Sequence, residues 1–316
     1  MNGFKKVIAV TLIIASVAIG IGAYILYESG FNVGDFRSNL DKFFNGNDFS
    51  LNLGNAVPVS ENKEFALGNK KDIVIETSIG QLIITENDGD TITMSVDGDI
   101  PSKYEKTYLK ITDTDEGLKI LALDDLNSIG DFGLNSYNLT VNISIPKKFV
   151  GNLDISTVSG ESSVTGFDLS SLDISSVSGD ITLQDGKYGS LKFYNVSGNV
   201  FAYSEAGKAQ GESVSGNMTL TSVNEGISLK SVSGNIKASI AALKGKATAN
   251  SISGEIEIDL LDSSEISYKL STLSGKLTVD DGGTVQTGEK SMTKTVSGTD
   301  RLIDASTVSG NIKIKY

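Results

Sequence analysis

The sequence contains no cysteine, no histidine and no tryptophan. Without cysteine the chain cannot form disulfides, carry a lipoprotein attachment cysteine or bind a metal through thiolates. Without histidine, Ser-His-Asp and Cys-His catalysis and every histidine-ligated zinc site are excluded. The lack of tryptophan weakens a lectin hypothesis based on stacking sugars against aromatic rings. The common classes of hydrolase and metalloenzyme are therefore disfavoured.

Arginine is scarce as well. Only Arg37 and Arg301 accompany 25 lysines, and the 316-residue chain has a net charge of −12. Proteins that bind nucleic acid rely on clustered Lys and Arg against phosphate. We therefore expect no nucleic-acid partner, and the sequence carries no motif that predicts a cofactor or a metal.

Two groups of residues could still suggest an enzyme or a cation site. Nine serines recur in the repeat described below, but no histidine or regularly placed lysine could activate them. Paired carboxylates could serve a glycosidase or calcium, but isolated pairs on strand-linking turns are usually just solvated. The acidic clusters are Asp113/Asp115/Glu116, Asp124/Asp125 and Asp280/Asp281. We interpret them as solvated and expect no catalytic residue.

A short phrase, Val-Ser-Gly with Ile or Leu replacing Val in two copies, occurs nine times. Its glycines, interpreted as structural turn residues, are Gly160, Gly179, Gly198, Gly216, Gly234, Gly254, Gly275, Gly298 and Gly310. Most successive glycines are 18 to 21 residues apart, and only the last two steps, of 23 and 12 residues, depart from this. A fixed period of this kind indicates a repeat architecture.

Apolar residues keep one register around the phrase. Counted from its first residue as zero, positions −5, −3, 0, +4 and +6 are apolar almost throughout, with Ser162 and Gly211 as exceptions once the irregular Val296 copy is set aside. Spacing by two on both sides of a Ser-Gly corner is typical of strands. The residues at zero are predicted to form a core ladder: Val158, Val177, Val196, Val214, Val232, Ile252, Leu273 and Val308.

The repeat therefore predicts an all-β fold, a β-solenoid with coils of about 19 residues. A run of hairpins in a β-sandwich is the alternative, but hairpins would not hold five apolar positions in one register. Regular coils are predicted over 151–316, and a strand-rich N-terminal part or cap over 61–150. Within that cap, residues 73–84 resemble a degenerate first copy around Gly80.

The C-terminal copies are expected to be less regular. Ser291, Thr293 and Asp300 occupy apolar positions around Val296, which predicts an irregular coil there. The last strand alternates Lys313 and Lys315 outward, a pattern that protects a terminal edge strand.

The N-terminus predicts one transmembrane helix. Residues 7–27 are uncharged and largely apolar, and two lysines precede them. Such a run is long enough to span a hydrocarbon core of about 30 Å, and the lysines predict a cytoplasmic segment 1–6. A cleaved signal peptide is the alternative. Residues 28–60 are predicted to be a juxtamembrane linker, either with a short amphipathic helix or as a partly disordered tether.

The recurring phrase SxVSG(D/N)I, after a strand-rich part and an anchor, resembles the bacterial putative-adhesin family of β-strand repeats, a family of unknown function. Membrane-anchored, LiaG-like members belong to envelope-stress operons of Gram-positive bacteria. The resemblance covers roughly residues 60–316 and implies a surface-displayed, non-enzymatic protein.

These observations lead to one expectation and two alternatives. We expect a membrane-anchored, extracytoplasmic β-solenoid that acts as an adhesin-like binding or scaffold module on a Gram-positive cell surface. Its partner would be an envelope protein or a cell-wall polymer, and its oligomeric state is left open. The alternatives are an accessory regulator of envelope-stress signalling and an enzyme acting on envelope polysaccharide.

Overall fold

The computed structural model describes residues 56–77, 80–101, 108–114, 117–122, 139–262 and 265–316. These residues form strands and turns without any helix, so among them no helix is available that could cross a membrane. The predicted cytoplasmic segment 1–6 and anchor 7–27 lie outside the described residues, as does most of the predicted linker. The first strand begins at Ala56, inside the range predicted as linker.

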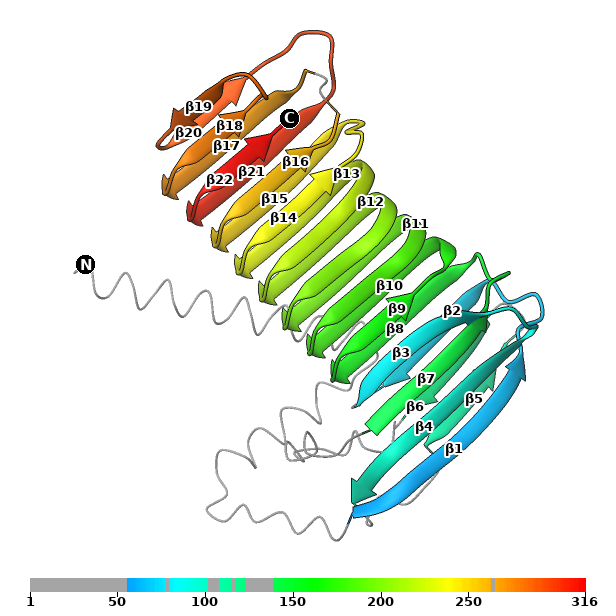
Figure 1. Cartoon of the computed structure of the whole chain (residues 1–316). Helices are drawn as coiled ribbons and strands as arrows, with labels where there is room; N and C mark the ends of the chain where they lie inside the picture. The colour runs from blue at the N-terminus through cyan, green and yellow to red at the C-terminus, as the bar shows by residue number, and fades with distance from the viewer. Residues whose placement is uncertain (1–55, 78–79, 102–107, 115–116, 123–138, 263–264) are drawn as a thin grey trace, which may run out of the picture.

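The described chain winds into a rod of stacked layers, as Figure 1 shows. From residue 152 onward, each layer contributes one strand before its Ser-Gly corner and one after it, and two further layers without a Ser-Gly pair lie at the N-terminal end. The strands before the corner form a parallel ladder, called here the pre-corner ladder. In spatial order it contains β6 (Gly117–Ala122), β2 (Asp72–Thr77), β8 (Asn152–Ser159), β10 (Asp168–Ser178), β11 (Ile181–Ser197), β12 (Val200–Ser215), β13 (Met218–Ser233), β15 (Lys246–Ser253), β21 (Leu302–Ser309) and β17 (Ser267–Ser274).

The strands after the corner form a second parallel ladder, the post-corner ladder. Long strands β11, β12 and β13 take part in both ladders, because each runs from one corner to the next. The post-corner order is β7 (Leu139–Pro146), β3 (Gln81–Asn87), β9 (Ser162–Thr165), the first parts of β11, β12 and β13, then β14 (Ile236–Ile240), β16 (Ile256–Leu260), β22 (Ile312–Lys315) and β18 (Leu277–Asp280).

Inside the rod, the two ladders face each other across an apolar core. Template positions −5, −3, +4 and +6 point inward, as in the layer of Leu172, Ile174, Ile181 and Leu183, whose side chains are at most 1% exposed. Gly211 stands at one of these apolar positions without a side chain, and a neighbouring residue fills the space. A Cβ there would lie 2.0 Å from Cζ of Phe193, so the phenyl ring of the adjacent layer occupies the missing side chain's place.

At the N-terminal end, the layers do not follow chain order. The layer of β2 and β3 lies between the layer of β6 and β7 and the layer of β8 and β9. Residues 73–84 therefore form a first coil, as the sequence predicted. Antiparallel strands then close the end: β5 (Leu109–Asp113) pairs with β6, and β4 (Thr91–Pro101) joins β7 to β1 (Ala56–Ala66).

The C-terminal end has the same kind of arrangement. The last layer in the sequence, β21 and β22, lies between the layer of β15 and β16 and the layer of β17 and β18. The short strands β19 (Val285–Gly288) and β20 (Ser291–Lys294) cover the outermost layer antiparallel. The prediction that the last strand forms a terminal edge is therefore wrong. Lys313 and Lys315 belong to an internal strand, paired on both sides.

Candidate binding surface

Each regular corner is closed by a hydrogen bond between equivalent positions of neighbouring layers. The glycine N–H donates to the serine carbonyl of the next layer, with distances of 3.0 Å for Gly179 to Ser197 and 3.1 Å for Gly198 to Ser215. A Cβ on Gly216 would lie 1.8 Å from the carbonyl oxygen of Gly198. A larger residue there would have to push two backbones apart, because the layers approach at this point.

The nine predicted turn glycines do not share one environment. Positive φ angles occur at Gly160, Gly179, Gly198, Gly216, Gly234, Gly275, Gly298 and Gly310. Gly254 has no such φ, yet its Cβ would lie 2.1 Å from the oxygen of Gly234, so it is stacked like the others. Gly298 is not stacked, and no atom lies within 4 Å of its Cβ position. The Val296 copy lies in a loop between β20 and β21, in agreement with the irregularity expected there.

The residues at position zero are on the outside of the corner, so the prediction of a core ladder is wrong for seven of the eight. Val214 alone is buried, at 9% exposed, and exposure reaches 48% at Val308 and 74% at Leu273. Strand alternation continues past position −1, which turns position zero outward. They form an apolar row along the corner, here called the valine ridge: Val158, Val177, Val196, Val214, Val232, Ile252, Val308 and Leu273.

The inward residue at each corner is polar and lies one position earlier. This inner polar row, 0–6% exposed, consists of Thr157, Ser176, Asn195, Ser213, Ser231, Ser251, Thr307 and Thr272. Asn195 Nδ2 donates to the carbonyl of Gly198 at 2.7 Å, and Thr272 Oγ1 donates to that of Gly310 at 3.1 Å. The sequence analysis missed this row, although only Ser, Thr or Asn occupies its positions. That restriction was the available signal.

A second polar row follows the corner glycines and links the layers through side chains. The N–H of Asn217 donates to Asn199 Oδ1 at 3.0 Å, and the N–H of Asn235 donates to Asn217 Oδ1 at 3.0 Å. The pattern continues through the inserted layer, where the N–H of Lys276 donates to Asn311 Oδ1 at 2.9 Å. These bonds explain why Asp or Asn so often follows the Ser-Gly pair.

The outer face of the post-corner ladder carries an uncharged area in its middle layers. Strand β12 holds two aromatic side chains there, Phe201 and Tyr203, whose rings lie 6.1 Å apart with 11° between their planes. Tyr203 is 46% exposed. Thr182 and Gln184 of β11 are in register with Phe201 and Tyr203. On the other side, Thr219 of β13 is in register with Phe201. We call this area the aromatic patch: Thr182, Gln184, Phe201, Tyr203, Thr219 and Thr221.

Carboxylates stand at the borders of the aromatic patch. Asp180 precedes it on the corner side, while Asp185 and Glu205 follow it on the return side and are exposed. Lysines stand there as well, since Lys187 is in register with Glu205 and Lys237 with Thr219. The patch is therefore a neutral, hydrogen-bonding area whose margins hold more carboxylates than lysines. An anionic partner would meet repulsion there, since like charges at close range disfavour association.

Beyond β13, the same face becomes charged. Glu257 on β16 lies between two lysines of the neighbouring layers, 3.1 Å from Lys237 and 3.3 Å from Lys313. The hydrogen bond from Lys237 is the main cause that lowers the pKa of Glu257. Exposed ion pairs of this kind contribute little to affinity or stability, so this half of the face has the properties of a solvated surface.

The outer face of the pre-corner ladder is also charged. Asp154 on β8 is in register with Asp173 on β10. Desolvation, followed by the charges of Asp173 and Glu76, raises the pKa of Asp154 to about 6. The third carboxylate, Glu76, is itself paired with Lys119 at 2.7 Å, and the ladder continues with Lys192 beside Asp173. This pair perturbs local electrostatics without forming a concave site.

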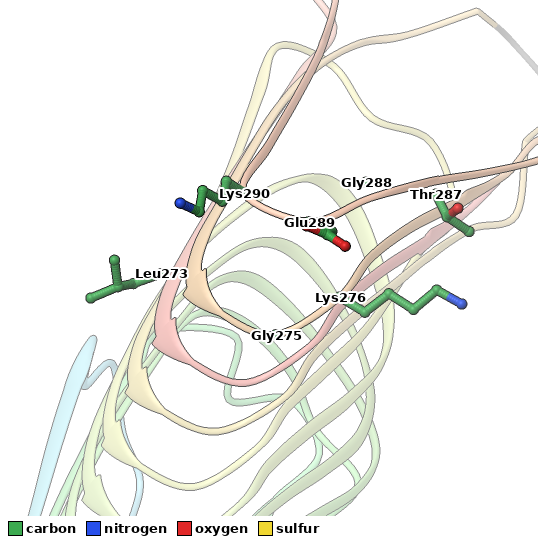
Figure 2. A pocket seen from close by; sticks show the side chains of 7 residues that line it. All are labelled: Leu273, Gly275, Lys276, Thr287, Gly288, Glu289 and Lys290. Atoms are coloured by element: carbon green, nitrogen blue, oxygen red, sulfur yellow. The ribbon is translucent and has the colours of Figure 1, made fainter.

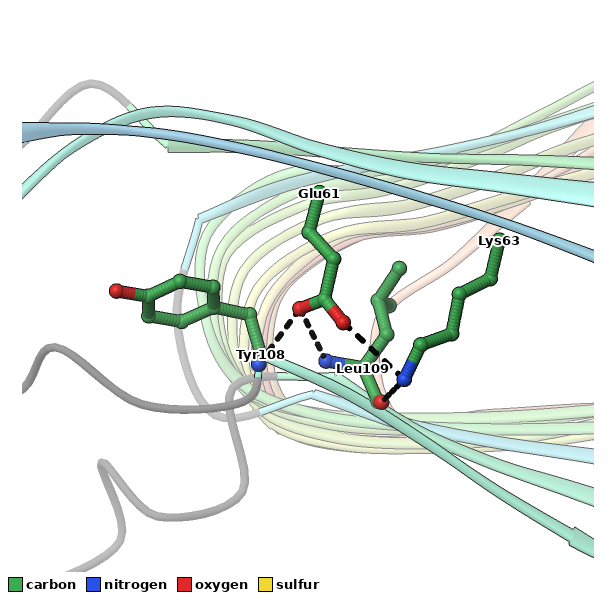
Figure 3. A network of polar contacts seen from close by, with 4 residues as sticks. All are labelled: Glu61, Lys63, Tyr108 and Leu109. Carbon is green, nitrogen blue, oxygen red and sulfur yellow. Dashed lines mark hydrogen bonds and ion pairs between the residues drawn. The ribbon is translucent and has the colours of Figure 1, made fainter.

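The N-terminal mouth of the rod is sealed by inward-pointing charges. Glu61 and Lys63 on β1 lie opposite the buried Val96 and Met94 of β4, so they point toward the interior side. As Figure 3 shows, the Glu61 carboxylate accepts the N–H groups of Tyr108 and Leu109, at 2.8 and 3.1 Å, and Lys63 Nζ donates to the Leu109 carbonyl. Side chains of the edge strand β1 thus form hydrogen bonds with backbone groups at the start of the edge strand β5. Inward-pointing charged residues of this kind are a known protection of sheet edges.

The C-terminal end carries an open pocket of about 630 Å³ between the last corner and the β19–β20 turn. Its lining includes Leu273, Lys276, Glu289 and Lys290. In Figure 2 the two lysine side chains point in different directions rather than toward one centre. A binding pocket for a small molecule normally has a few convergent polar groups, and this one has none among the residues drawn.

The acidic clusters that the structure describes have structural roles. Asp281 Oδ1 accepts the N–H groups of Gly283 and Thr284 at 3.1 and 2.7 Å, which shapes the turn before β19. Asp113 forms an ion pair with Lys70. Residues 115, 116, 124 and 125 lie outside the described residues. Across the described ranges, no group of three or more acidic side chains is placed to hold a metal ion.

The solved structures that this chain resembles have low sequence identity to it. A protein described as a putative adhesin from Parabacteroides distasonis ATCC 8503 is 15% identical, with a TM-score of 0.47 over 83% of this chain and 97% of its own. A putative adhesin from Bacteroides fragilis NCTC 9343 is 14% identical, with a TM-score of 0.44 over 81% and 97%. A putative lipid binding protein from Parabacteroides distasonis ATCC 8503 is 16% identical, with a TM-score of 0.41 over 81% and 96%.

No curated protein matches the chain significantly. The profile of one protein family, described as Toastrack DUF4097, matches residues 70–315. That range runs from just before β2 to the last residue of β22 and therefore contains every layer of the rod. The chain thus belongs to the Toastrack DUF4097 family.

Proposed function

We propose that this protein is a non-enzymatic binding module of the cell envelope. Residues 7–27 would anchor it in the membrane, and the β-solenoid would stand outside the cytoplasm with its broad outer faces available to a partner. The observation that carries the proposal is the shape of the described surface: two long ladders with tight corners, and at the C-terminal end an open pocket without convergent polar groups. Flat, repeated surfaces suit extended partners better than small substrates.

Electrostatics supports the same function. Ionisable groups with shifted pKa values occur as pairs on the outer faces of the ladders, such as Asp154 beside Asp173 and Lys237 beside Glu257. The described carboxylates thus occur in pairs, turns or single rows rather than in one cleft. Catalytic sites usually gather such groups in a concave site.

The proposal can be tested with isolated cell envelopes. The full-length chain, coupled to fluorescent beads, should bind envelopes saturably, and beads carrying an unrelated acidic protein should not. In cells, the chain should fractionate with membranes and be degraded by protease added outside, while a variant lacking residues 7–27 should leave the membrane fraction. Absence of saturable binding to any envelope fraction would remove the proposed function.

A further inference from the structure

The aromatic patch differs from the rest of the described outer surface. It lacks charge in a chain of net charge −12, and it combines two aromatic rings with three threonine hydroxyls and one glutamine amide. Neighbouring strands of the ladder are about 4.8 Å apart, so Thr182, Phe201 and Thr219 present their side chains at this interval along the rod.

We propose that the aromatic patch binds an uncharged polysaccharide, which rests on the proposed envelope-binding function and specifies its partner. Sugar rings have apolar C–H faces and rims of hydroxyl groups. The C–H groups carry partial positive charge and favour the negative face of an aromatic ring. Phe201 and Tyr203 provide such rings, and the threonine and glutamine side chains can donate to and accept from sugar hydroxyls.

The spacing of the patch favours a polymer over a single sugar. Along the row of Thr182, Phe201 and Thr219, an outward side chain repeats at about 4.8 Å. This interval matches the length of roughly one sugar unit in an extended glycan. Each contact is weak because the surface is flat, but a polymer that covers several layers gains affinity through multivalency. The regular ladder thus supplies the arrangement that a linear glycan needs.

The charges around the patch select against other partners. Three carboxylates, Asp180, Asp185 and Glu205, stand at its margins against two lysines. Lys187 is in register with Glu205, and Lys237, in register with Thr219, is paired with Glu257. The remaining negative charge would repel phosphate- or uronate-bearing polymers and anionic membranes. A protein partner would require a larger apolar centre, since protein interfaces depend on buried aromatic or aliphatic anchors in well-packed pockets. Carboxylates beside an aromatic pair, by contrast, are suitable acceptors for sugar hydroxyls.

Affinity electrophoresis of the full-length chain tests the inference directly. Native gels would contain laminarin or hydroxyethylcellulose as neutral glycans, and polygalacturonate as the anionic comparison. The wild-type chain should be retarded by at least one neutral glycan and not by polygalacturonate. The double variant Phe201→Thr/Tyr203→Thr should weaken this retardation about tenfold or more, the loss expected for two aromatic contacts.

The substitutions are chosen so that folding is preserved. Threonine occupies the register partners of Phe201 on both sides, at Thr182 and Thr219, and favours strands. Tyr194→Ala, which removes an outward aromatic residue from the pre-corner face, is the matched control and should leave retardation unchanged. The midpoint of thermal unfolding of each variant should be close to that of the wild-type chain. The single variant Phe201→Thr provides a second test and should show an intermediate loss of retardation.

The outcomes separate this inference from the proposed function. If the double variant retains full retardation, or the wild type is retarded by neither neutral glycan, the glycan inference is overturned. The bead assay then decides the broader proposal. The envelopes are treated either with protease or with periodate, which oxidises vicinal diols of sugars. Wild-type binding that survives protease treatment but is lost after periodate oxidation supports a glycan partner. Binding lost only after protease treatment would leave the envelope module standing and identify its partner as a protein.

Discussion

The two Val-Ser-Gly copies that end at Gly298 and Gly310 contain the same three residues, yet only the second forms a corner of the solenoid. The N–H of Gly310 donates to Ser274 of the next layer at 2.9 Å, and its Cβ position lies 2.1 Å from the oxygen of Gly254. Gly298 lies in a turn of the loop between β20 and β21, with open space around it.

The difference between the copies lies in their flanks. Around Val308, the side chains of Ile303, Ala305, Ile312 and Ile314 are fully buried. Around Val296, the corresponding positions hold Ser291, Thr293, Asp300 and Leu302. The tripeptide permits a tight corner, but the alternating apolar residues on both sides provide the burial that places it in the stack. A motif of three residues is therefore insufficient evidence for a coil.

The largest expected effect comes from adding one methyl group at each glycine. Gly310→Ala should lower the free energy of unfolding by about 3 kcal/mol or more, because the new Cβ would overlap a backbone oxygen. Gly298→Ala should cost about 1 kcal/mol, which reflects only its positive φ. Urea denaturation of the full-length chain measures both. Equal losses for the two variants would show that stacking does not distinguish the copies.

A smaller difference is expected from the flanking residues. Ile312→Ala creates a cavity at a fully buried position and should cost about 2–4 kcal/mol. Val296→Ala, in the loop, should change stability by less than about 1 kcal/mol. The two variants are compared by the shift of their urea denaturation midpoints, provided that the slope of the unfolding free energy against urea concentration is unchanged. If Val296→Ala is the more damaging change, the loop rather than the inserted layer holds the C-terminal end together.

The side-chain row after the glycines provides the third test. Asn311→Ala removes the acceptor of the Lys276 N–H and should cost about 1 kcal/mol. The amide of Lys276 should then exchange its hydrogen faster, which native-state hydrogen exchange detects. The equivalent residue after Gly298 is Thr299, whose hydroxyl accepts only the N–H of Arg301 within the same turn. Thr299→Ala should leave Lys276 exchange unchanged, so an equal acceleration in both variants would contradict the interlayer role.

Much of the fold could be predicted because strand alternation is a local property. Positions −5, −3, +4 and +6 are apolar and buried, and a degenerate coil around Gly80 could be recognised from the same pattern. The valine ridge was assigned to the wrong side because apolar residue type was equated with burial. Exposed apolar residues are common on protein surfaces, and the polar residue before each valine was the better indicator of the inner side.

The order of the layers could not be predicted, for a different reason. All parallel coils carry nearly the same apolar pattern, so the pattern alone does not determine which coils are neighbours. The antiparallel pairing of β19 and β20 with the layer of β17 and β18 covers that layer's outer side. This leaves the internal position to β21 and β22. The aromatic patch, by contrast, was visible as Phe201-x-Tyr203 at outward positions, but single aromatic pairs are not specific enough in sequence to define a site.

The smallest expected effect concerns the carboxylate four residues before the valine. Asp304, before Val308, lies 2.8 Å from Lys246, whereas Asp154, before Val158, is in register with Asp173 and has its pKa raised to about 6. A raised pKa means that the folded state binds the proton more tightly than the unfolded state. The stabilising contribution of Asp154 is therefore complete below about pH 4, the unfolded pKa, and is lost as the pH rises through about 6.

Asp154→Asn should therefore raise the midpoint of thermal unfolding at pH 7.5 and change it little at pH 4. The gain should stay below about 1 kcal/mol, because Asp154 lies on the outer face, where solvent reduces both the desolvation of its carboxylate and the repulsion by Asp173. Asp304→Asn is the matched control and should have the opposite sign at pH 7.5, since it removes an ion pair with Lys246. If Asp154→Asn destabilises the chain at both pH values, the stacked carboxylates do not repel each other.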